Sequence, residues 1–221
     1  MNDAFIFNID KPEDWTSHDV VNKIRYQTRI RKVGHAGTLD PFATGVLLVL
    51  TGRNTKRQSE FMGMSKEYIA RVELGTTTDT GDRTGKVTGT QSVPDLSTED
   101  LESLVPAFTG EIQQVPPMYS AKKVKGRKLY EMARKGQVIE REPILVRIDE
   151  LSFDNLDGVH FDMRVVCGKG TYIRVLAEDI GRELGTGAHL KELRRTAVGD
   201  YRAADAWTID EFFDKWKSFA A

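Results

Sequence analysis

Apolar residues recur at two spacings along this chain, and each spacing predicts one kind of element. In residues 66–75 every second side chain is apolar, which predicts a strand with one buried face. That face would carry Tyr68, Ala70, Val72 and Leu74. In residues 171–184 apolar side chains recur every three or four positions, which predicts a helix with one buried side. That side would carry Ile173, Leu176, Ile180 and Leu184.

The same patterns, together with short apolar runs, predict the remaining elements. Further strands are expected at residues 4–9, 45–50, 144–153 and 160–167. Further helices are expected at residues 16–30, 54–64, 97–108 and 208–216, and a polar loop or ribbon at 76–89. Strands and helices do not alternate in the regular rhythm of a parallel sheet. We therefore expect an α+β fold with a mixed or mainly antiparallel sheet flanked by helices.

Composition places the chain among ordinary globular proteins and limits the compartments that suit it. The chain has 221 residues, 39% of them hydrophobic and 29% charged. Its single cysteine, Cys167, excludes an intramolecular disulfide and is typical of a reducing cytoplasm. The first residues are acidic where a signal peptide needs a basic head, and the longest apolar run is too short to span a bilayer. We expect a cytoplasmic protein with no membrane contact.

Positive charge is concentrated in two segments although the net charge is only −1. Residues 22–32 carry basic side chains and no acid, and residues 121–135 carry seven basic side chains against one glutamate. Pro116 and Pro117 precede the second segment, and Gly126 interrupts it, so no regular element is expected from 115 to 128. Such segments are either solvated helix faces or surfaces that follow a phosphate backbone. Two of them, each beside aromatic residues, favour a nucleic-acid partner.

The stretch "GHAGTLDPFATGV" places a carboxylate, Asp40, at the edge of an apolar run. Gly34 and Gly37 allow a tight turn or a close approach to a ligand, and Pro41 restricts the backbone of Asp40. Asp40 is therefore either a turn or cap residue or a reactive carboxylate held rigidly. His35 has no second histidine or cysteine at metal-ligand spacing, so we expect no metal site.

Two further residues suggest a site without defining one. Arg174 falls in the first turn of the helix expected at 171–184, with Thr171 as the expected N-cap. A cation there opposes the helix dipole and needs an anionic partner, either a structural acid or a catalytic aspartate. Tyr68 lies on the apolar face of its strand, where it is either a core residue or a ring presented to a ligand.

Five blocks, in order, resemble one known family. They are "GHAGTLDPFATGVL", "KEYIARVELGTTTDTGDRTG", "PPMYSAKKVKGRKLYEMAR", "CGKGTYIRVLAEDIG" and "GAHLKELRRTAVG". The chain resembles the bacterial tRNA pseudouridine synthase B (TruB) family. The resemblance implies the pseudouridine synthase fold, with residues 1–221 as one catalytic domain. It also implies an RNA-binding thumb insertion at about 112–136, while the chain leaves no room for a separate C-terminal RNA-binding domain. Many relatives have glycine where this chain has Asp14, so the turn near Lys11 is expected to differ.

The resemblance implies that the protein isomerises uridine 55 in the TψC loop of tRNA to pseudouridine after flipping the base. Asp40 matches the catalytic aspartate, Arg174 its ion-pair partner, and Tyr68 the tyrosine that stacks on the base and is a candidate for C5 proton transfer. Contacts to RNA or to the flipped nucleotide are implied for His35, Tyr172 and Leu190, and support of the pocket for Lys11. The thumb lysines expected to bind RNA are Lys122, Lys123 and Lys125. No cofactor, metal or guide RNA is implied, and a monomer is expected.

Two other functions use the same residues differently. A non-catalytic RNA-binding or tRNA-folding protein would need the groove but no anion among phosphates, so Asp40 argues against it. A synthase of the same fold could act on another RNA, such as ribosomal RNA with a guide. The absence of an added RNA-binding or partner-docking segment argues against that function.

Overall fold

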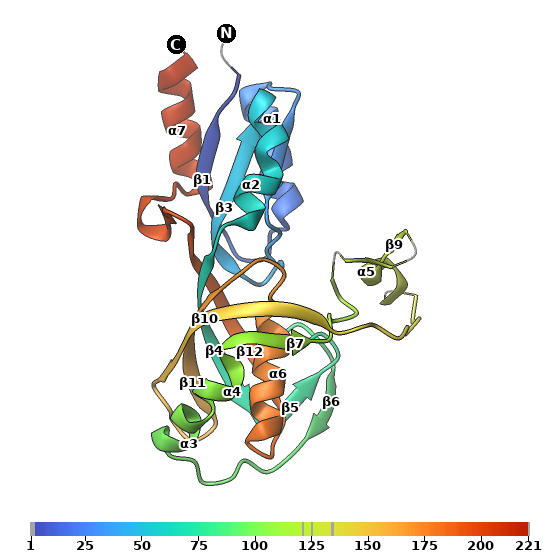
Figure 1. Ribbon diagram of the computed structural model, residues 1–221. Coiled ribbons are helices and arrows are strands. Elements are labelled where there is room, and N and C mark those ends of the chain that lie inside the picture. The colour runs from blue at the N-terminus through green and yellow to red at the C-terminus, as the bar shows by residue number, and fades with distance from the viewer. Residues whose placement is uncertain (1–2, 121, 125, 134, 221) are drawn as a thin grey trace. The chain divides into compact units, whose positions relative to one another are not determined.

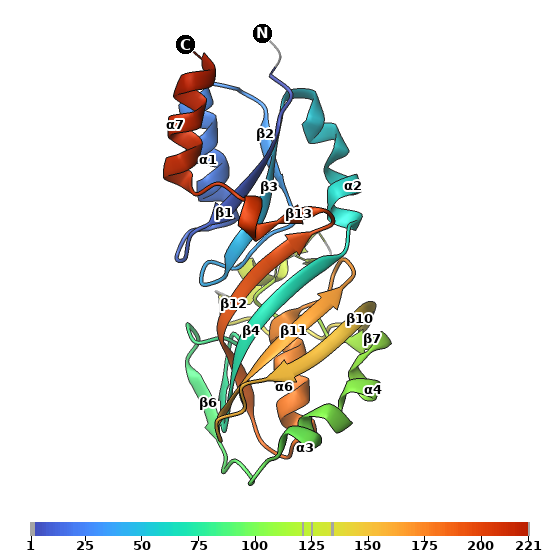
Figure 2. The same ribbon diagram turned by 90° about the vertical axis from the view of Figure 1, so that its left-hand side faces the viewer.

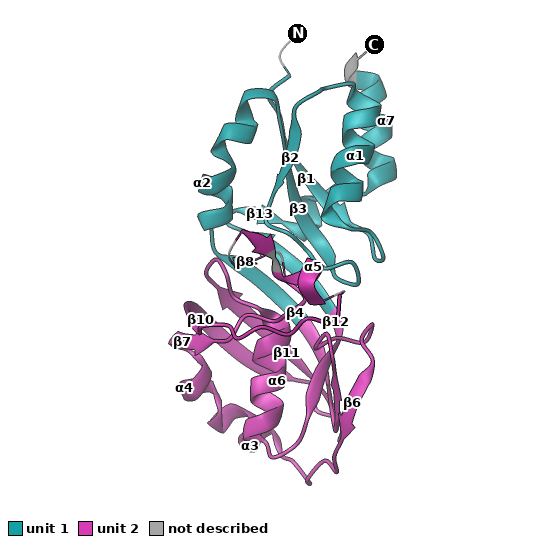
Figure 3. Ribbon diagram, turned by 90° about the vertical axis from the view of Figure 1, so that its right-hand side faces the viewer, with its two compact units in different colours: residues 1–69, 193–221 teal, residues 70–192 magenta. Residues whose placement is uncertain are grey.

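The computed structural model describes residues 3–120, 122–124, 126–133 and 135–220. The chain forms two compact units (Figure 3). Unit 1 contains residues 1–69 and 193–221, and unit 2 contains residues 70–192. The chain passes between them along strands β4 (Lys66–Leu74) and β12 (Ala188–Val198).

The sheet of unit 1 is built around β3 (Thr44–Thr51). Strand β1 (Ile6–Lys11) pairs with β3 in antiparallel register, Ile6 opposite Leu50. Strand β2 (Val33–Ala36) pairs antiparallel with the second half of β3. Residues Arg194 and Arg195 of β12 pair in parallel with the first two residues of β3. Strand β13 (Tyr201–Arg202) continues from β12 as a short hairpin. The apolar run expected to be a buried strand is almost fully buried, as predicted.

Helices cover both faces of the unit 1 sheet (Figure 2). Helices α1 (Ser17–Thr28) and α7 (Ile209–Ala220) pack on one face around Phe7 and Phe212. On the other face, the 3₁₀ helix η1 (Gly52–Arg57) leads into α2 (Gln58–Gly63), whose Phe61 packs on Leu48 and Leu50. A capping box of Thr16 and Asp19 starts α1 and fixes the direction in which the chain enters the helix.

In unit 2 the strands of the sheet are neighbours in the order β12, β4, β11, β10 and β7. Its remaining strands are β7 (Gly110–Gln114), β10 (Ile144–Asp154) and β11 (His160–Cys167). The expected alternation along β4 is confirmed, because every second residue from Lys66 to Leu74 is buried. A separate ribbon of β5 (Thr76–Thr78) and β6 (Val87–Thr90) occupies the polar segment after β4. The α+β prediction is confirmed.

Helix α6 (Ile173–Glu183) covers one face of the unit 2 sheet (Figure 1), and α3 (Thr98–Ser103) and α4 (Val105–Phe108) lie nearby. The N-cap of α6 is Tyr172, so the prediction of Thr171 is wrong. The Thr171 hydroxyl instead donates to the Gly168 carbonyl at 3.1 Å and stabilises the preceding turn. Cys167, at the end of β11, forms no disulfide and is 1% exposed.

The basic segment after the two prolines is more ordered than its sequence predicts. It contains a two-residue hairpin, β8 (Lys123–Val124) and β9 (Arg127–Lys128), followed by α5 (Leu129–Ala133). Gly126, which was expected to break any regular element, has φ 80° and lies in the turn of this hairpin. Glycine enters that backbone region freely, so it allows the hairpin to form. Leu129 and Met132 are buried and anchor α5.

Candidate active site

Asp40 lies in the loop between β2 and β3, and buried side chains hold the residues on either side of it. The Ser17 hydroxyl accepts a hydrogen bond from the Leu39 N–H at 2.9 Å and donates to the Leu39 carbonyl at 3.2 Å. Ser17 begins α1 and is 2% exposed, so the helix carries this hydroxyl to a fixed position. One side chain therefore satisfies both backbone groups of the residue before Asp40.

Pro41, the residue after Asp40, is held by Lys11 at the end of β1. Lys11 is fully buried, and its Nζ donates to the carbonyls of Pro41 at 3.0 Å, Pro12 at 2.8 Å and Trp15 at 2.6 Å. Burial lowers the pKa of Lys11 from 10.5 to about 8, against the opposing attraction of nearby carboxylates, chiefly Asp40. The protonated amine has a partner for each of its three hydrogens, which is the arrangement that supports this loop.

His35 and Arg195 lie beside the start of the same loop. Burial, followed by the charge of Arg195, lowers the pKa of His35, so the ring is neutral at neutral pH. The His35 Nδ1 has no hydrogen-bond partner among the described residues. Arg195 is 1% exposed and donates to the carbonyls of Val46 at 2.7 Å and Gly37 at 3.1 Å. A buried guanidinium thus fixes the glycine turn that leads toward Asp40.

The turn between β1 and α1 contains Asp14, at the position where the family resemblance leads us to expect glycine. Asp14 has φ 63°, in the left-handed region that glycine enters freely and that aspartate tolerates better than most residues. Asp14 therefore occupies a backbone conformation that suits glycine.

Tyr68 lies on the buried face of β4, in unit 1, and is 9% exposed. Its neighbours on that face, Lys66 and Ala70, are also buried. The predicted position on the apolar face is confirmed. Its predicted role, stacking on a nucleobase, stays a prediction.

Arg174 lies in the first turn of α6, in unit 2, and is 5% exposed. Its Nη1 donates to the Thr80 carbonyl at 2.5 Å and its Nη2 to the Tyr119 carbonyl at 2.8 Å. Its Nε lies 3.8 Å from a carboxylate oxygen of Asp82. Within unit 2, Arg174 thus has both backbone acceptors and an acid, and its pairing with Asp40 stays a prediction.

Asp82 is a buried residue that the sequence alone did not single out. One of its carboxylate oxygens accepts hydrogen bonds from the Thr80 hydroxyl and from the N–H and hydroxyl of Thr84, at 2.5–2.9 Å. Its other oxygen faces Arg174. The clue was the spacing of aspartate and threonine in "TDTGDRT", which is typical of a self-bonded Asx turn and was interpreted only as a polar loop.

Tyr172 and Leu190 lie on either side of this region of unit 2. The Gln114 amide, 1% exposed, accepts from the Tyr172 N–H at 3.0 Å and donates to the Tyr172 carbonyl at 3.3 Å. Leu190 is fully buried, and its backbone bonds to Gly81 at 3.0 Å and Arg83 at 2.9 Å. Leu190 therefore anchors the Asp82 loop through its backbone, and its predicted nucleotide contact stays a prediction.

The predicted thumb lysines are described only in part. Lys122 is half-buried, and its carbonyl accepts a hydrogen bond from the Leu129 N–H at 2.9 Å. Lys123 belongs to β8, but its side chain lies outside the described residues, as does the whole of Lys125. RNA binding by this segment stays a prediction.

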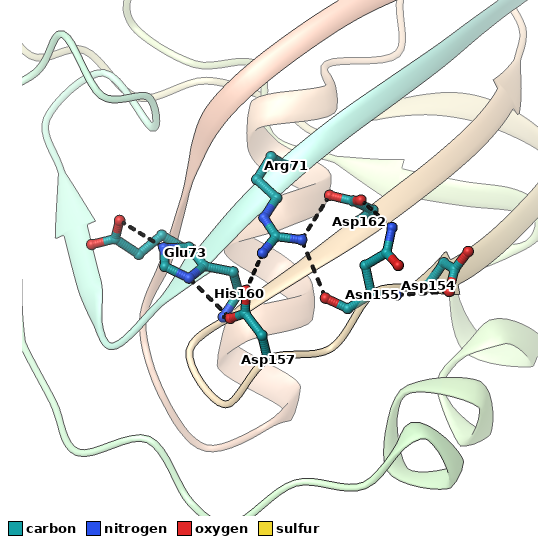
Figure 4. Close-up of polar contacts among 7 residues, drawn as sticks. All are labelled: Arg71, Glu73, Asp154, Asn155, Asp157, His160 and Asp162. Carbon is teal, nitrogen blue, oxygen red and sulfur yellow. Dashed lines mark hydrogen bonds and ion pairs between the residues drawn. The ribbon is translucent and has the colours of Figure 1, made fainter.

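A charged network lies on strands β4 and β11 of unit 2 (Figure 4). Arg71 forms ion pairs with Asp157 and, at 3.1 Å, with Asp162. His160 lies between Asp157, at 3.1 Å, and Glu73, at 3.4 Å. These contacts fasten β4 to the hairpin that joins β10 and β11, so their role is structural.

Comparison with known proteins places the fold in one class, the pseudouridine synthases. A family model described as "TruB family pseudouridylate synthase (N terminal domain)" matches residues 25–173. A second, described as "tRNA pseudouridylate synthase B C-terminal domain", matches residues 174–220. The chain belongs to the TruB family of pseudouridylate synthases, which are isomerases. Residues 174–220 are divided between the two units. The expectations of one catalytic domain and of no separate C-terminal RNA-binding domain stay predictions.

Similar proteins cover most of this chain at high identity. The chain is 45% identical over 213 residues to tRNA pseudouridine synthase B of Phocaeicola vulgatus, covering 94% of this chain and 91% of that protein. It is 48% identical to tRNA pseudouridine synthase B of Parabacteroides distasonis, covering 88% of this chain and 86% of that protein.

Solved structures share the fold. A chain from "Crystal Structure of a Cbf5-Nop10-Gar1 Complex" is 29% identical with a TM-score of 0.76, over 98% of this chain and 56% of that one. A chain from "Structure of H/ACA RNP bound to a substrate RNA containing 2'-deoxyuridine" is 28% identical with a TM-score of 0.71, over 98% and 55%. This chain therefore spans a little more than half of those solved chains. The predicted pseudouridine synthase fold is confirmed.

In the described part of the chain, helices are too short or too polar to cross a bilayer.

Proposed function

We propose that this protein converts uridine 55 in the TψC loop of tRNA to pseudouridine. The observation that carries the proposal is Asp40, in a chain of this family, held between two backbone anchors. Ser17 fixes the residue before it and Lys11 fixes the residue after it. Such restraint is useful for a carboxylate that must meet one atom of a substrate.

The reaction is an isomerisation and balances without a co-reactant. The bond between uracil N1 and ribose C1′ breaks, the uracil turns, and a bond forms between C5 and C1′. C5 loses its proton and N1 gains one. Asp40 either attacks C1′ or acts in forming a glycal-like intermediate, and in both cases the ionised carboxylate is the reactive form. Because no electrons are exchanged, no redox cofactor is required, and the proposed steps use no metal.

We assign the other predicted residues roles that serve this step. Arg174 keeps Asp40 ionised, and Tyr68 stacks on the flipped uracil and is a candidate for moving the C5 proton. An aromatic platform offsets the stacking that the base loses when it leaves the folded loop. The neutral imidazole of His35 and the ring of Tyr172 contact the RNA around the flipped nucleotide.

The thumb at 112–136 supplies positive charge to the phosphate backbone through Lys122, Lys123 and Lys125. The protein acts in the cytoplasm as a monomer on tRNA alone. Support for a tRNA substrate comes from the curated relatives, which are named tRNA pseudouridine synthase B.

A second candidate is a synthase directed to its target by a guide RNA. The observation that favours it is the likeness to chains of H/ACA complexes, at 28–29% identity over 98% of this chain. The identity to proteins named tRNA pseudouridine synthase B is higher, at 45–48%, which favours direct tRNA recognition.

One assay separates these candidates. The purified protein is incubated with an unmodified tRNA transcript in EDTA, without guide RNA, and tritium release from C5-labelled uridine is measured. We expect stoichiometric release, and none from a transcript with cytidine at position 55. Release that depends on added guide RNA would favour the second candidate. Release that depends on added metal, with the tRNA fold unchanged, would contradict the metal-free mechanism.

A further inference from the structure

One basic surface of unit 1 has no part in the proposed site. It is formed by Arg29, Arg31, Lys32, Arg53 and Lys56, and we call it the distal basic patch. Two chain segments build it, the loop after α1 and the 3₁₀ helix η1. The Gly52 N–H donates to the Lys32 carbonyl at 2.8 Å, and Val33 pairs with Thr51, so the two segments lie side by side.

The cations of the distal basic patch are exposed and not engaged by the protein. All five side chains are exposed, and none forms a hydrogen bond or ion pair with another residue in the described part of the chain. Arg53 and Lys56 are three residues apart in a 3₁₀ helix, which places them on the same side. Arg57, by contrast, is paired with Glu60 at 2.6 Å. Unpaired cations held together repel one another, so the arrangement costs stability unless an anion binds.

An aromatic side chain accompanies these cations. Tyr26, in the last turn of α1, is 84% exposed, and residues 22–32 contain no acid. An exposed ring three residues before Arg29 in the chain is typical of surfaces that contact both phosphates and bases of RNA. One carboxylate, that of Asp3, lies beside Gly52 at the margin of the patch.

The patch and Asp40 lie at opposite ends of the same strand. Asp40 lies four residues before β3 (Thr44–Thr51), and Arg53 lies two residues after it. An eight-residue strand is roughly 25 Å long at about 3.3 Å per residue. β2 runs back beside it, from Lys32 at the patch toward the Asp40 loop. The nucleotide at Asp40 therefore cannot itself reach the patch.

We propose that the distal basic patch binds the phosphate backbone of the tRNA substrate outside the TψC stem-loop. This inference rests on the proposed function, because it concerns a second contact with the same substrate. Each cation that meets a phosphate releases a counterion, so the patch contributes affinity that decreases steeply with salt. It has no part in the chemistry at C1′.

The test compares one patch variant with a control of equal charge. The patch variant carries Arg31→Gln, Arg53→Gln and Lys56→Gln. The control carries Arg147→Gln, Arg182→Gln and Lys217→Gln, three exposed cations that are each paired with an aspartate. Both lose the same three positive charges, so only the location of the loss differs. Binding is measured against salt concentration with a full-length tRNA transcript and with the isolated TψC stem-loop.

For the patch variant we expect about tenfold or weaker binding of full-length tRNA, and a salt slope reduced by about 2 to 3. Its affinity for the stem-loop and its turnover on that substrate should equal those of the wild type, and the control should bind both RNAs nearly normally. Equal losses for tRNA and stem-loop would overturn the proposal, as would unchanged tRNA binding. Loss of binding to phosphatidylserine vesicles with unchanged tRNA binding would assign the patch to lipid instead.

Failure of the proposed function gives a different result. If the wild type makes no pseudouridine but binds tRNA through the patch, the enzymatic proposal fails and the patch inference stands.

Discussion

The loop of Asp40 in unit 1 and the start of α6 in unit 2 use the same device to hold a candidate catalytic residue. In unit 1 the Ser17 hydroxyl bonds both backbone groups of Leu39, next to Asp40. In unit 2 the Gln114 amide bonds both backbone groups of Tyr172, two residues before Arg174. Each clamp is a buried polar side chain distant in sequence from the residue it holds. Each unit therefore fixes its own candidate residue by itself.

The two regions differ in what surrounds the charged group. Beside Asp40, Lys11 supplies a buried cation whose pKa burial lowers to about 8. Around Arg174, the acceptors are the Thr80 and Tyr119 carbonyls and, at 3.8 Å, the Asp82 carboxylate. Arg174 is thus oriented by two backbone carbonyls and lies beside one carboxylate.

The largest effect should follow from removing the charge of Asp40. Asp40→Asn preserves size and serves a turn or cap almost as well, but its amide is no nucleophile. We expect a folded protein that binds tRNA normally or more tightly and loses roughly 10⁴-fold or more of its activity, measured by tritium release. Near-normal release would make Asp40 a turn residue, and the protein an RNA-binding one.

Arg174→Lys tests the unit 2 side of the comparison. Lysine keeps the charge but loses the planar, two-pronged geometry that suits a carboxylate. We expect turnover to fall roughly 10²-fold or more, with tRNA affinity changed far less. The matched variant is Asp82→Asn. If it reduces turnover as much as Arg174→Lys, Arg174 acts through Asp82. If affinity falls in proportion to activity, Arg174 is a phosphate contact.

Removing each clamp should have similar, smaller effects in the two units. Ser17→Ala and Gln114→Leu each leave a buried backbone N–H without its partner, which costs about 1–3 kcal/mol in the free energy of unfolding. We expect kcat to fall with KM little changed, because the catalytic groups lose position while the RNA surface remains. Ser17→Thr, which keeps the hydroxyl, should restore kcat, and Ser103→Ala, at an exposed serine, should change neither quantity. Loss of stability without loss of kcat would make the clamps purely structural.

The pH dependence of Lys11 should separate its role in the loop from its effect on stability. The pKa of Lys11 is about 8 in the folded protein and near 10.5 when unfolded. Above about pH 8 the neutral amine has two hydrogens for three carbonyls, so activity should fall. Between these two pKa values the unfolded chain binds more protons, so the contribution of Lys11 to stability should rise with pH. Activity and stability should therefore move in opposite directions from pH 8 to 10. The fall in activity above pH 8, the alkaline limb of the pH profile, should be absent in Lys11→Gln. An unchanged limb in that variant would assign it to another group.

The smallest effect concerns Asp14. Asp14→Gly relieves a side chain from the left-handed region but adds freedom to the unfolded chain, so stability should change by less than about 1 kcal/mol. It also removes a carboxylate that raises the pKa of Lys11, so the alkaline limb of activity should move slightly to lower pH. A limb that moves upward would contradict the assignment of that limb to Lys11.

Patterns with a short period predicted the fold well, while contacts between distant residues were missed. The alternation along β4 and the helical spacing in α6 depend on local geometry, so both were recognised. Asp40, Arg174 and Tyr68 were selected from motifs. Ser17, Gln114 and Arg195 act through backbone groups 22 to 158 residues away, and no local pattern encodes such a partner. Thr171 was the wrong cap because its hydroxyl bonds backward to Gly168 rather than forward into the helix.

The burial of Cys167 allows dyes to be attached at chosen positions without removing the native cysteine. It is the chain's single cysteine and is 1% exposed, so thiol-reactive dyes should not react with the native protein. Cysteines introduced at two exposed positions, such as Lys217→Cys in unit 1 and Arg147→Cys in unit 2, would then be the reactive sites. Fluorescence energy transfer between dyes at those positions would follow, in solution and molecule by molecule, how far apart the two units stand as tRNA arrives and leaves.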